Sequence, residues 1–218
     1  MRGPPGRSIR PRKPVEKVAV CGVPIFVVLL RGINLGGRNR VAMGALRQVL
    51  SSSGYGDVQS YVQSGNVVLR SRLQEKSLAA DVHQHLSDTF GLDIGVFVRN
   101  ATQMAELAAN NPFLRPGVDH GRQLHVAFLE AAPDPRTIAA LDPHRAPPDV
   151  LHPRGREIYI WAPNGIGPSK VLHGLDRLLA TSMTVRNWRT VTALLDMTKD
   201  RPDPGAGMPG TPEPLPEP

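Results

Sequence analysis

Short apolar runs alternate with amphipathic stretches along this chain. Residues 25–30 are apolar without interruption, which predicts a strand that is buried on both faces. Residues 43–53 place three apolar side chains on one face of a helix, which Gly54 ends. Two strands, a helix and a strand follow, predicted at 58–62, 67–70, 74–90 and 94–98. The first half therefore has the predicted order strand, helix, strand, strand, helix, strand.

The same order returns after a short helix predicted at 102–109. Its elements are a strand at 124–130, a helix at 135–141 capped by Asp134, strands at 150–152 and 157–161, a helix at 169–180, and a strand at 183–186. A last helix is predicted at 188–197, with Asn187 as its candidate N-cap. Pairs with glycine in "QSGN" and at Arg154-Gly155 suit tight hairpin turns. We predict an α+β protein of two ferredoxin-like β-α-β-β-α-β repeats packed together, plus a C-terminal helix.

This predicted topology has consequences for packing. Helices cover one face of each sheet, and the absence of polar residues in 25–30 indicates that the other repeat covers the second face. We also expect the first and third strands of each repeat to run parallel. On that expectation, the loop 31–40 and the loop 164–170 leave their sheets at corresponding ends, where a pseudo-twofold arrangement would bring them together.

Composition separates the tails from the folded body. The chain has 218 residues, 40% of them hydrophobic, and a net charge of +7. Residues 1–17 carry six basic residues against one acidic residue, so much of the positive charge lies in a tail. We predict disordered proline-rich tails at 1–17 and 199–218, a first repeat at 18–110, and a second repeat with the C-terminal helix at 111–198.

The apolar segment 18–30 predicts neither a secretory signal nor a membrane span. Pro24 interrupts it, Arg31 ends it, and it is shorter than the roughly 20 residues that a span needs. The single cysteine, Cys21, allows no intrachain disulfide. We expect a cytoplasmic protein without a membrane partner, and neither a cofactor nor a metal site, because His83 and His85 point to different faces of their helix.

Six sequence motifs carry a resemblance to a known family. They are, in order, "LLRGINLGGRNRVAMGALRQVL", "YVQSGNVVL", "NPF", "LHVAFLE", "GIGPSK" and "VRNW". In these motifs residues 25–197 resemble the bacterial family called domain of unknown function 1697. The resemblance implies an α+β fold with two ferredoxin-like repeats and implies no established activity. That family often has lysine where Arg38 and Arg40 stand and asparagine where Arg189 stands.

The loop "RGINLGGRNR" is the first candidate binding site. Arg31, Asn34, Arg38 and Asn39 lie on a glycine-rich segment between a strand end and a helix start. Backbone N–H groups and arginine side chains in such a place suit a phosphate or a carboxylate. The alternative is a bending loop with solvated arginines. The segment matches neither dinucleotide-binding nor Walker sequences.

Three further stretches offer polar groups of the same kind. The loop "NGIGPSK" begins a predicted helix, the hairpin "YVQSGN" has a polar turn, and "VRNW" combines an ionic and an aromatic side chain. For each, the alternative is a structural role as a cap, a turn or a packed strand end. The additional candidate ligand-binding residues are Gln63, Ser64, Asn66, Ser169, Lys170, Arg186, Asn187 and Trp188.

The preferred function is the binding of a small anionic or nucleotide-like molecule at the glycine-rich basic loops. Nucleic acid is the alternative partner, through loops and the basic tail. The strand at 25–30 offers only Phe26, the strand at 67–70 offers no aromatic group, and the strand at 157–161 offers Tyr159 and Trp161, so the usual aromatic signature of an RNA-recognition module is absent. An enzyme acting on a phosphorylated substrate is the second alternative. Ser169 and Lys170 are sequence neighbours that face apart at a helix start, so we favour no catalytic assignment. The oligomeric state is left open.

Overall fold

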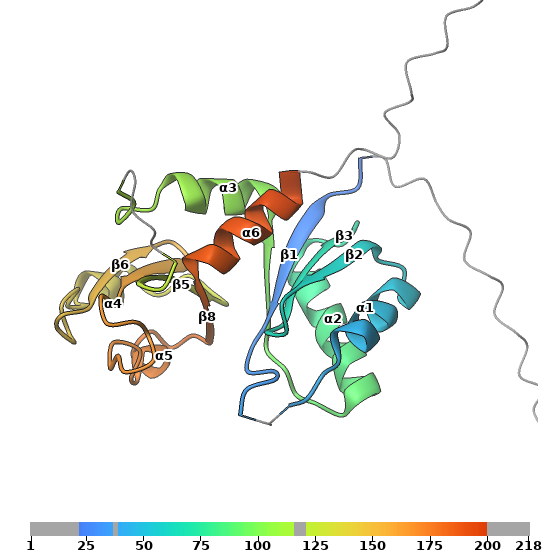
Figure 1. Cartoon of the computed structure of the whole chain (residues 1–218), viewed down its shortest axis with the longest axis horizontal. Helices are drawn as coiled ribbons and strands as arrows, with labels where there is room; N and C mark the ends of the chain where they lie inside the picture. The colour runs from blue at the N-terminus through green and yellow to red at the C-terminus, as the bar shows by residue number, and fades with distance from the viewer. Residues whose placement is uncertain (1–21, 37–38, 116–120, 200–218) are drawn as a thin grey trace, which may run out of the picture.

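The computed structural model describes residues 22–36, 39–115 and 121–199. These residues form an α+β protein with two four-stranded antiparallel sheets and a C-terminal helix (Figure 1). The predicted tails, 1–17 and 199–218, lie outside the described residues, apart from Lys199 at the end of that helix.

The first half contains one sheet, two helices on it and a third helix that leaves it. The sheet has the strand order β2-β3-β1-β4. The elements are β1 (Ile25–Leu30), α1 (Met43–Ser52), β2 (Gly56–Tyr61), β3 (Asn66–Arg70), α2 (Glu75–Phe90), β4 (Val96–Asn100) and α3 (Ala101–Ala109).

The second half has the corresponding strand order, β6-β7-β5-β8, with shorter helices. Its elements are β5 (Leu124–Leu129), α4 (Pro135–Ala139), β6 (Val150–Arg154), β7 (Glu157–Trp161), α5 (Leu175–Leu178), β8 (Met183–Asn187) and α6 (Trp188–Lys199). The predicted cap of α4 is confirmed, because the Asp134 side chain accepts a hydrogen bond from the Arg136 N–H at 2.7 Å.

The prediction of parallel first and third strands is wrong. β1 pairs with β3 in the antiparallel sense, and β5 pairs with β7 in the same way. The physical reason is the order of connections: the crossover helix returns the chain parallel to the first strand, and the hairpin then reverses it. The loops after β1 and after β7 therefore leave their sheets at opposite ends.

The predicted helix at 169–180 is also wrong in length. Only Leu175–Leu178 is α-helical, and it follows a turn in which Gly174 has φ of 67°. Because this left-handed conformation cannot continue a helix, the preceding residues form separate turns. Leu178 is 50% exposed, whereas Leu175 is fully buried.

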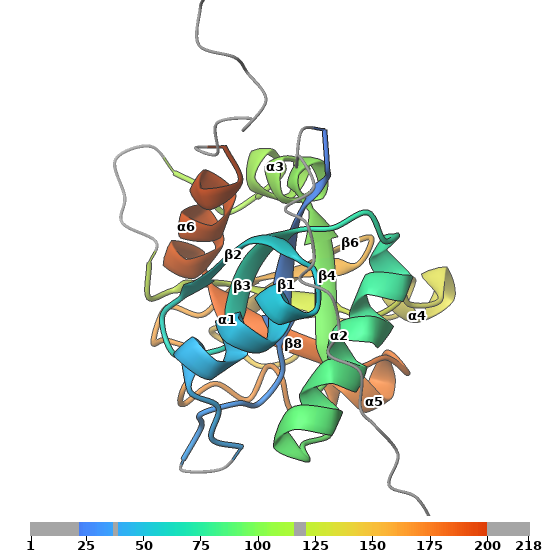
Figure 2. The same ribbon diagram turned by 90° about the vertical axis from the view of Figure 1, so that its right-hand side faces the viewer.

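Three clusters of buried apolar side chains hold the fold together. One lies between the first sheet and α1 with α2, which cover the same sheet face (Figure 2). Another lies between the second sheet and the α4–α5 side. The central cluster joins side chains from both sheets with side chains from α3 and α6. The expectation that the second half covers β1 is confirmed, and α3 and α6 complete that cover.

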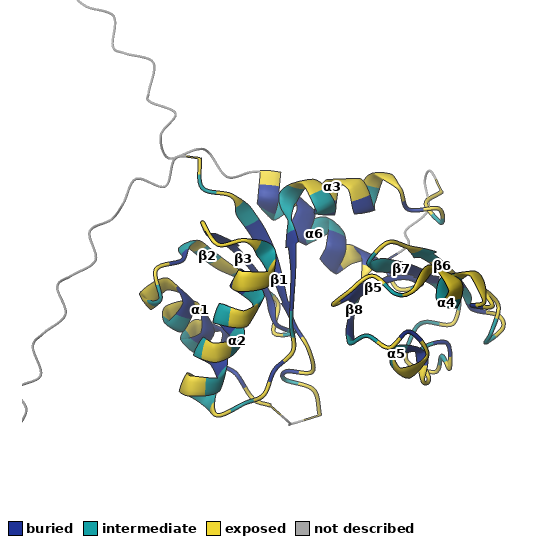
Figure 3. Ribbon diagram, turned by 180° about the vertical axis from the view of Figure 1, so that it is seen from behind, coloured by how far each residue is buried: buried dark blue, intermediate teal, exposed yellow. Residues whose placement is uncertain are grey.

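Burial follows this layered arrangement (Figure 3). Every residue of β5 is buried, and so is every residue of β1 after Ile25, because each strand has a core on both faces. The helices instead keep a polar face in water. Side chains that lie where the halves meet therefore leave water, and a polar group there needs partners inside the protein.

Candidate functional site at the junction of the two halves

Arg186 of β8 reaches from the second half into the first and is 8% exposed. Its guanidinium has five N–H groups, and five hydrogen bonds to oxygen atoms of both halves are present. The acceptors are Asn66 Oδ1 at 2.5 Å, Thr184 Oγ1 at 2.8 Å, and the carbonyls of Val185 at 2.9 Å, Leu30 at 2.8 Å and Ser64 at 3.2 Å. The Arg186 side chain therefore ties the two halves together.

All five acceptors of Arg186 are neutral. Burial lowers the pKa of Arg186 to about 10, so the side chain remains protonated at neutral pH. The dipoles of amide, hydroxyl and carbonyl groups stabilise the positive charge of Arg186. Loss of the guanidinium would leave several buried oxygen atoms without a hydrogen-bond donor.

The glycine-rich loop after β1 is closed by its own asparagines. Asn34 Nδ2 donates to the carbonyl of Val41 at 2.9 Å and to that of Gln63 at 2.7 Å, and Asn34 Oδ1 accepts from the Val41 N–H at 2.9 Å. Asn39 Nδ2 donates to the carbonyl of Gly32 at 3.2 Å. Both asparagines have positive φ, 54° for Asn34 and 47° for Asn39. These contacts fix the bend and join the loop to the β2–β3 hairpin.

The structure brings residues from three predicted motifs into one place. Asn34 contacts the hairpin at Gln63, Asn66 Nδ2 donates to Ser64 Oγ at 3.0 Å, and Arg186 contacts both Asn66 and Ser64. Each of these polar groups is engaged by the protein itself. Their assignment as ligand-binding residues stays a prediction.

The other predicted site residues lie apart from this cluster. Asn187 Oδ1 accepts from the Thr190 N–H at 2.8 Å and caps α6, as expected. Trp188 is 9% exposed and packs in the central core. Ser169 Oγ donates to Asp149 Oδ2 at 2.5 Å within the second half, and Lys170 beside it is exposed. Arg38 lies outside the described residues.

Sequence reasoning missed a second arginine that spans the junction in the opposite direction. Arg99 of β4 is 2% exposed. Its Nε donates to Glu157 Oε1 at 2.6 Å, and its Nη atoms donate to three carbonyls, those of Val98 at 2.7 Å, Leu129 at 2.9 Å and Arg156 at 3.1 Å. This side of the junction is therefore ionic.

Sheet register makes Arg99 and Arg186 counterparts. Arg99 lies opposite Val27 on β1, and Arg186 lies opposite Val126 on β5. Both donate through Nη1 to the preceding carbonyl of their own strand. The tripeptide Val-Arg-Asn occurs at 98–100 and again at 185–187, and this was the signal that could have identified the pair.

Around Arg99 the charges form a connected group. Glu75 Oε1 lies 2.5 Å from Arg156 Nη1 and 4.0 Å from Arg99 Nη1, and Gln103 Nε2 donates to Glu75 Oε2 at 3.0 Å. Burial raises the pKa of Glu75, but hydrogen bonds from Arg156 and Gln103 and the charges of both arginines outweigh it and hold the pKa below its usual value. Burial lowers the pKa of Arg99, against the opposing effect of Glu157.

A large groove lies between the halves on this ionic side. Its volume is about 1380 Å³, and α2, β4 and the segment around α5 line it. The rim carries Arg31, Lys76 and Arg177. The Arg31 side chain is 45% exposed, and its Nη2 lies 3.6 Å from Asp176 Oδ2 of the other half. Residues from both halves therefore contribute positive charge to one surface.

The comparisons with known proteins identify the family. Residues 24–159 match the family described as "Protein of unknown function (DUF1697)". The chain belongs to the DUF1697 family. A search of curated proteins finds no match to this chain.

A solved structure shares the fold of this DUF1697 chain. It is described as "The structure of conserved bacterial protein SP0830 from Streptococcus pneumoniae". The two chains are 20% identical, the match covers 81% of this chain and 99% of that one, and the TM-score is 0.60. The likeness supports the architecture and carries no information about a ligand.

Within 22–36, 39–115 and 121–199, no three histidine, cysteine, aspartate or glutamate side chains are grouped as a metal site would require. No helix in the same part of the chain combines the length and apolar character needed to cross a bilayer.

Proposed function

We propose that this DUF1697 protein binds a small anionic ligand in the groove between its two halves. The observation that carries the proposal is the pair of unpartnered cations on the groove rim. Lys76 on α2 and Arg177 on α5 line the groove from opposite halves, and among the described residues neither side chain has a hydrogen-bond or ion-pair partner. Two such cations, with Arg31 on the same lining, suit a phosphate or carboxylate.

The acidic residues of the groove offset this charge only in part. Glu75 is held by Arg99 and Arg156, and Asp176 faces Arg31. Asp93 Oδ1 lies 3.6 Å from His83 Nε2. Glu130 is the acid on the lining for which the described residues provide no side-chain partner. The lining as a whole carries five basic side chains against these four carboxylates, so its net charge is positive.

This proposal places the anion site beside the glycine-rich loop and not within it. Arg31 begins that loop and faces the groove, whereas Asn34 and Asn39 are occupied in holding the bend. We further interpret the two halves as ferredoxin-like repeats. Their common strand order, their corresponding arginines and the asparagine cap that follows each arginine support that interpretation.

The proposal is tested by thermal-shift assays and calorimetry, in which phosphate, citrate, nucleotides and sugar phosphates are titrated into the protein. We expect one anion class to stabilise the wild type, and Arg177→Ala or Lys76→Ala to weaken its binding by about 1–3 kcal/mol, the scale of a charge-assisted hydrogen bond. Arg136→Ala is the matched control, because Arg136 is exposed on α4 and is not part of the groove lining. An unchanged wild type, or equal responses of the groove and control variants, would refute the proposal.

Nucleic acid remains the alternative partner, and the fold restricts how it could bind. Phe26 is 6% exposed and Tyr159 is 1% exposed, so these strand aromatics are not available to stack on bases. Binding would have to use loops and basic side chains, with strong salt dependence. Retention of a labelled oligonucleotide at physiological salt would favour this alternative over the small anion.

A further inference from the structure

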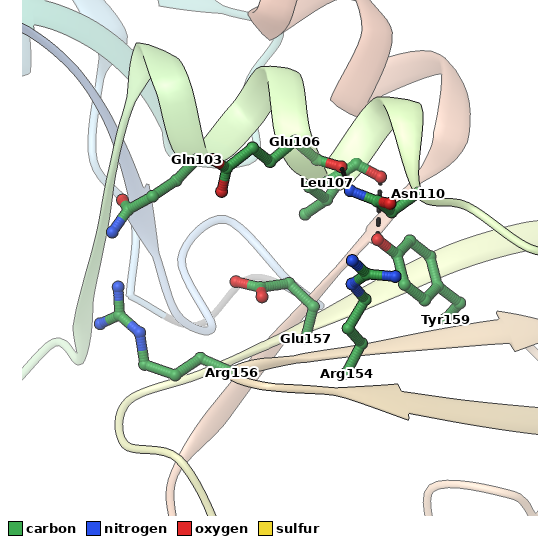
Figure 4. Close-up of a pocket in the computed structure, with 8 residues that line it drawn as sticks. All are labelled: Gln103, Glu106, Leu107, Asn110, Arg154, Arg156, Glu157 and Tyr159. Carbon is green, nitrogen blue, oxygen red and sulfur yellow. Dashed lines mark hydrogen bonds between the residues drawn. The ribbon is translucent and has the colours of Figure 1, made fainter.

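A second cavity lies between α3 and the β6–β7 hairpin (Figure 4). Its volume is about 410 Å³, within the range of small-molecule sites. The two walls are joined at one end, where the Tyr159 hydroxyl donates to the carbonyl of Leu107 at 2.8 Å. Elsewhere α3 stands away from the hairpin, and polar side chains line the space between them.

The corresponding space on the other side of the junction is filled by apolar packing. There α6 packs on β1, β2 and β3, and the shared asparagine caps, Asn100 and Asn187, set a common helix register. In this register Glu106 corresponds to Ala193, and Asn110 corresponds to Met197. The fold is therefore compatible with a closed helix–hairpin contact, and the polar cavity under α3 is not a requirement of the architecture.

Two charged side chains of the cavity are not used by the protein. Glu106 and Arg154 line it from opposite walls, and both are exposed. Among the described residues, neither side chain has a hydrogen-bond or ion-pair partner. Glu157 uses Oε1 for Arg99, while no hydrogen bond is formed by its Oε2 within the described part of the chain. Figure 4 shows the carboxylates of Glu106 and Glu157 facing the same space.

The other polar groups of the lining are either neutral or already paired within the protein. Burial, helped by the charge of Glu157 and opposed by that of Arg154, raises the pKa of Tyr159 to about 12, so the phenol stays protonated at neutral pH. Arg156 is already bound to Glu75. The cavity therefore presents the Glu106 carboxylate from α3. The hairpin presents the Glu157 carboxylate and the free Arg154 guanidinium, which are neighbours across β6 and β7.

We propose that this cavity binds a small zwitterion of the size of an α-amino acid. The ammonium group lies between the carboxylates of Glu106 and Glu157, and the carboxylate group pairs with Arg154. A purely anionic ligand would meet two carboxylates, and a purely cationic ligand would leave the Arg154 guanidinium unpaired, so each is disfavoured. Arg156 lines both this cavity and the anion groove, but Glu106, Glu157 and Arg154 are not on the groove lining, so the proposal does not depend on that groove.

The test is an NMR titration of the full chain with the common α-amino acids at millimolar concentration. Each is compared with its deaminated acid and its decarboxylated amine as single-charge probes. We expect at least one amino acid to shift the side-chain amide signals of Asn110 and Gln103, which line the cavity, and the matched acid and amine to leave them unchanged. If no amino acid shifts these signals, or if the single-charge probes shift them equally, the proposal is overturned.

Variants locate the site. Glu106→Gln and Arg154→Gln should each weaken amino acid binding at least tenfold, while Arg154→Lys should recover part of it. The matched controls are Asp196→Asn and Arg136→Gln, which change exposed charged residues outside both cavities and should bind as the wild type does. Glu106 and Arg154 are themselves exposed, so a loss of binding with an unchanged unfolding temperature supports the site. Equal affinity in site and control variants rejects it.

Discussion

Arg186 and Arg99 perform the same task at the two sides of the junction with different chemistry. Each crosses to the other half, and each donates to the carbonyl at the end of the facing central strand, Leu30 or Leu129. They differ in the residue that accepts from Nε, which is Asn66 for Arg186 and Glu157 for Arg99. The neutral side is closed by α6, whereas the ionic side borders both cavities. The comparison indicates that both arginines tie the halves together, that the Arg186 side is closed by the protein itself, and that cavities lie beside Arg99.

Replacing the two arginines in turn gives the largest expected effect. Arg186→Met should lower the free energy of unfolding by about 3–5 kcal/mol, because it leaves buried acceptors at Asn66, Leu30 and Ser64 without a donor. Arg99→Met should lower it by about 2–3 kcal/mol, because the stranded Glu157 side chain is 19% exposed and lies on a cavity that water can enter.

Chemical denaturation of both variants measures this difference. A larger loss for Arg99→Met than for Arg186→Met would contradict the assignment of the closed, fixing role to the neutral side. Lys199→Met changes a basic side chain that is 59% exposed at the end of α6 and provides the control for the removal of a surface charge.

The two hairpin glycines give the next contrast. Gly65 has φ of 73°, and a Cβ there would lie 2.8 Å from side-chain atoms of Ile33 and Leu30. Gly65→Ala should therefore cost about 2–4 kcal/mol, from backbone strain and overpacking together. Gly155 has φ of 59°, but its Cβ would meet nothing nearer than Glu157 Oε2 at 3.9 Å. Gly155→Ala should cost only about 1 kcal/mol, from strain alone.

Thermal unfolding of the two glycine variants decides whether the hairpins differ in packing. Equal losses would mean that the backbone conformation dominates at both turns. In that case the tight fit between the first hairpin and the loop after β1 would contribute nothing measurable.

The sequence predicts the order of elements well because the spacing of apolar residues within each short stretch indicates a helix or a strand. The buried strand at 25–30 and the cap at Asn187 needed only neighbouring residues, and both are present. The helix predicted at 169–180 is shorter in the structure because one glycine, Gly174, outweighs a helical pattern of leucines. Strand direction was misjudged because it depends on how a crossover and a hairpin combine, which no single stretch shows.

The site was harder to predict than the fold. The motifs around Asn34, Asn66 and Arg186 do meet, but the contacts between them are internal to the protein. Glu75 and Glu157 approach Arg99 only because the halves pack together, and their separation in sequence gives no local signal. A comparison of the two Val-Arg-Asn stretches would have indicated that Arg99 and Arg186 are equivalent.

Acid should weaken the ionic side selectively. The pKa of Glu75 is lowered in the folded protein, so its contribution to stability is present above the usual carboxyl pKa and is lost as the pH falls through the folded value. Between about pH 5 and pH 3, the wild type should therefore lose more stability than Glu75→Gln does.

Hydrogen exchange at several pH values locates this loss. We expect amides of the β6–β7 hairpin and the start of α2 to become less protected in acid, and amides around Asn66 to change little. If the free energy of unfolding depends on pH in the same way for the wild type and Glu75→Gln, the Glu75 contacts with Arg156 and Gln103 contribute no net stability.

The helix caps give the smallest expected effect and the finest test of the comparison. Asn100 and Asn187 follow the two arginines and cap α3 and α6, each accepting a hydrogen bond at 2.8 Å. At Asn100 the Gln103 side chain also accepts from the Asn100 N–H at 2.8 Å, which completes a capping box. Substitution of either asparagine by alanine should cost about 1 kcal/mol.

Because α6 is held by apolar packing on the first sheet and α3 stands over a cavity, Asn100→Ala should also increase exchange of the first-turn amides of α3 more than Asn187→Ala does in α6. Hydrogen exchange measures both, and equal fraying of the two helices would remove the distinction between a closed and an open side.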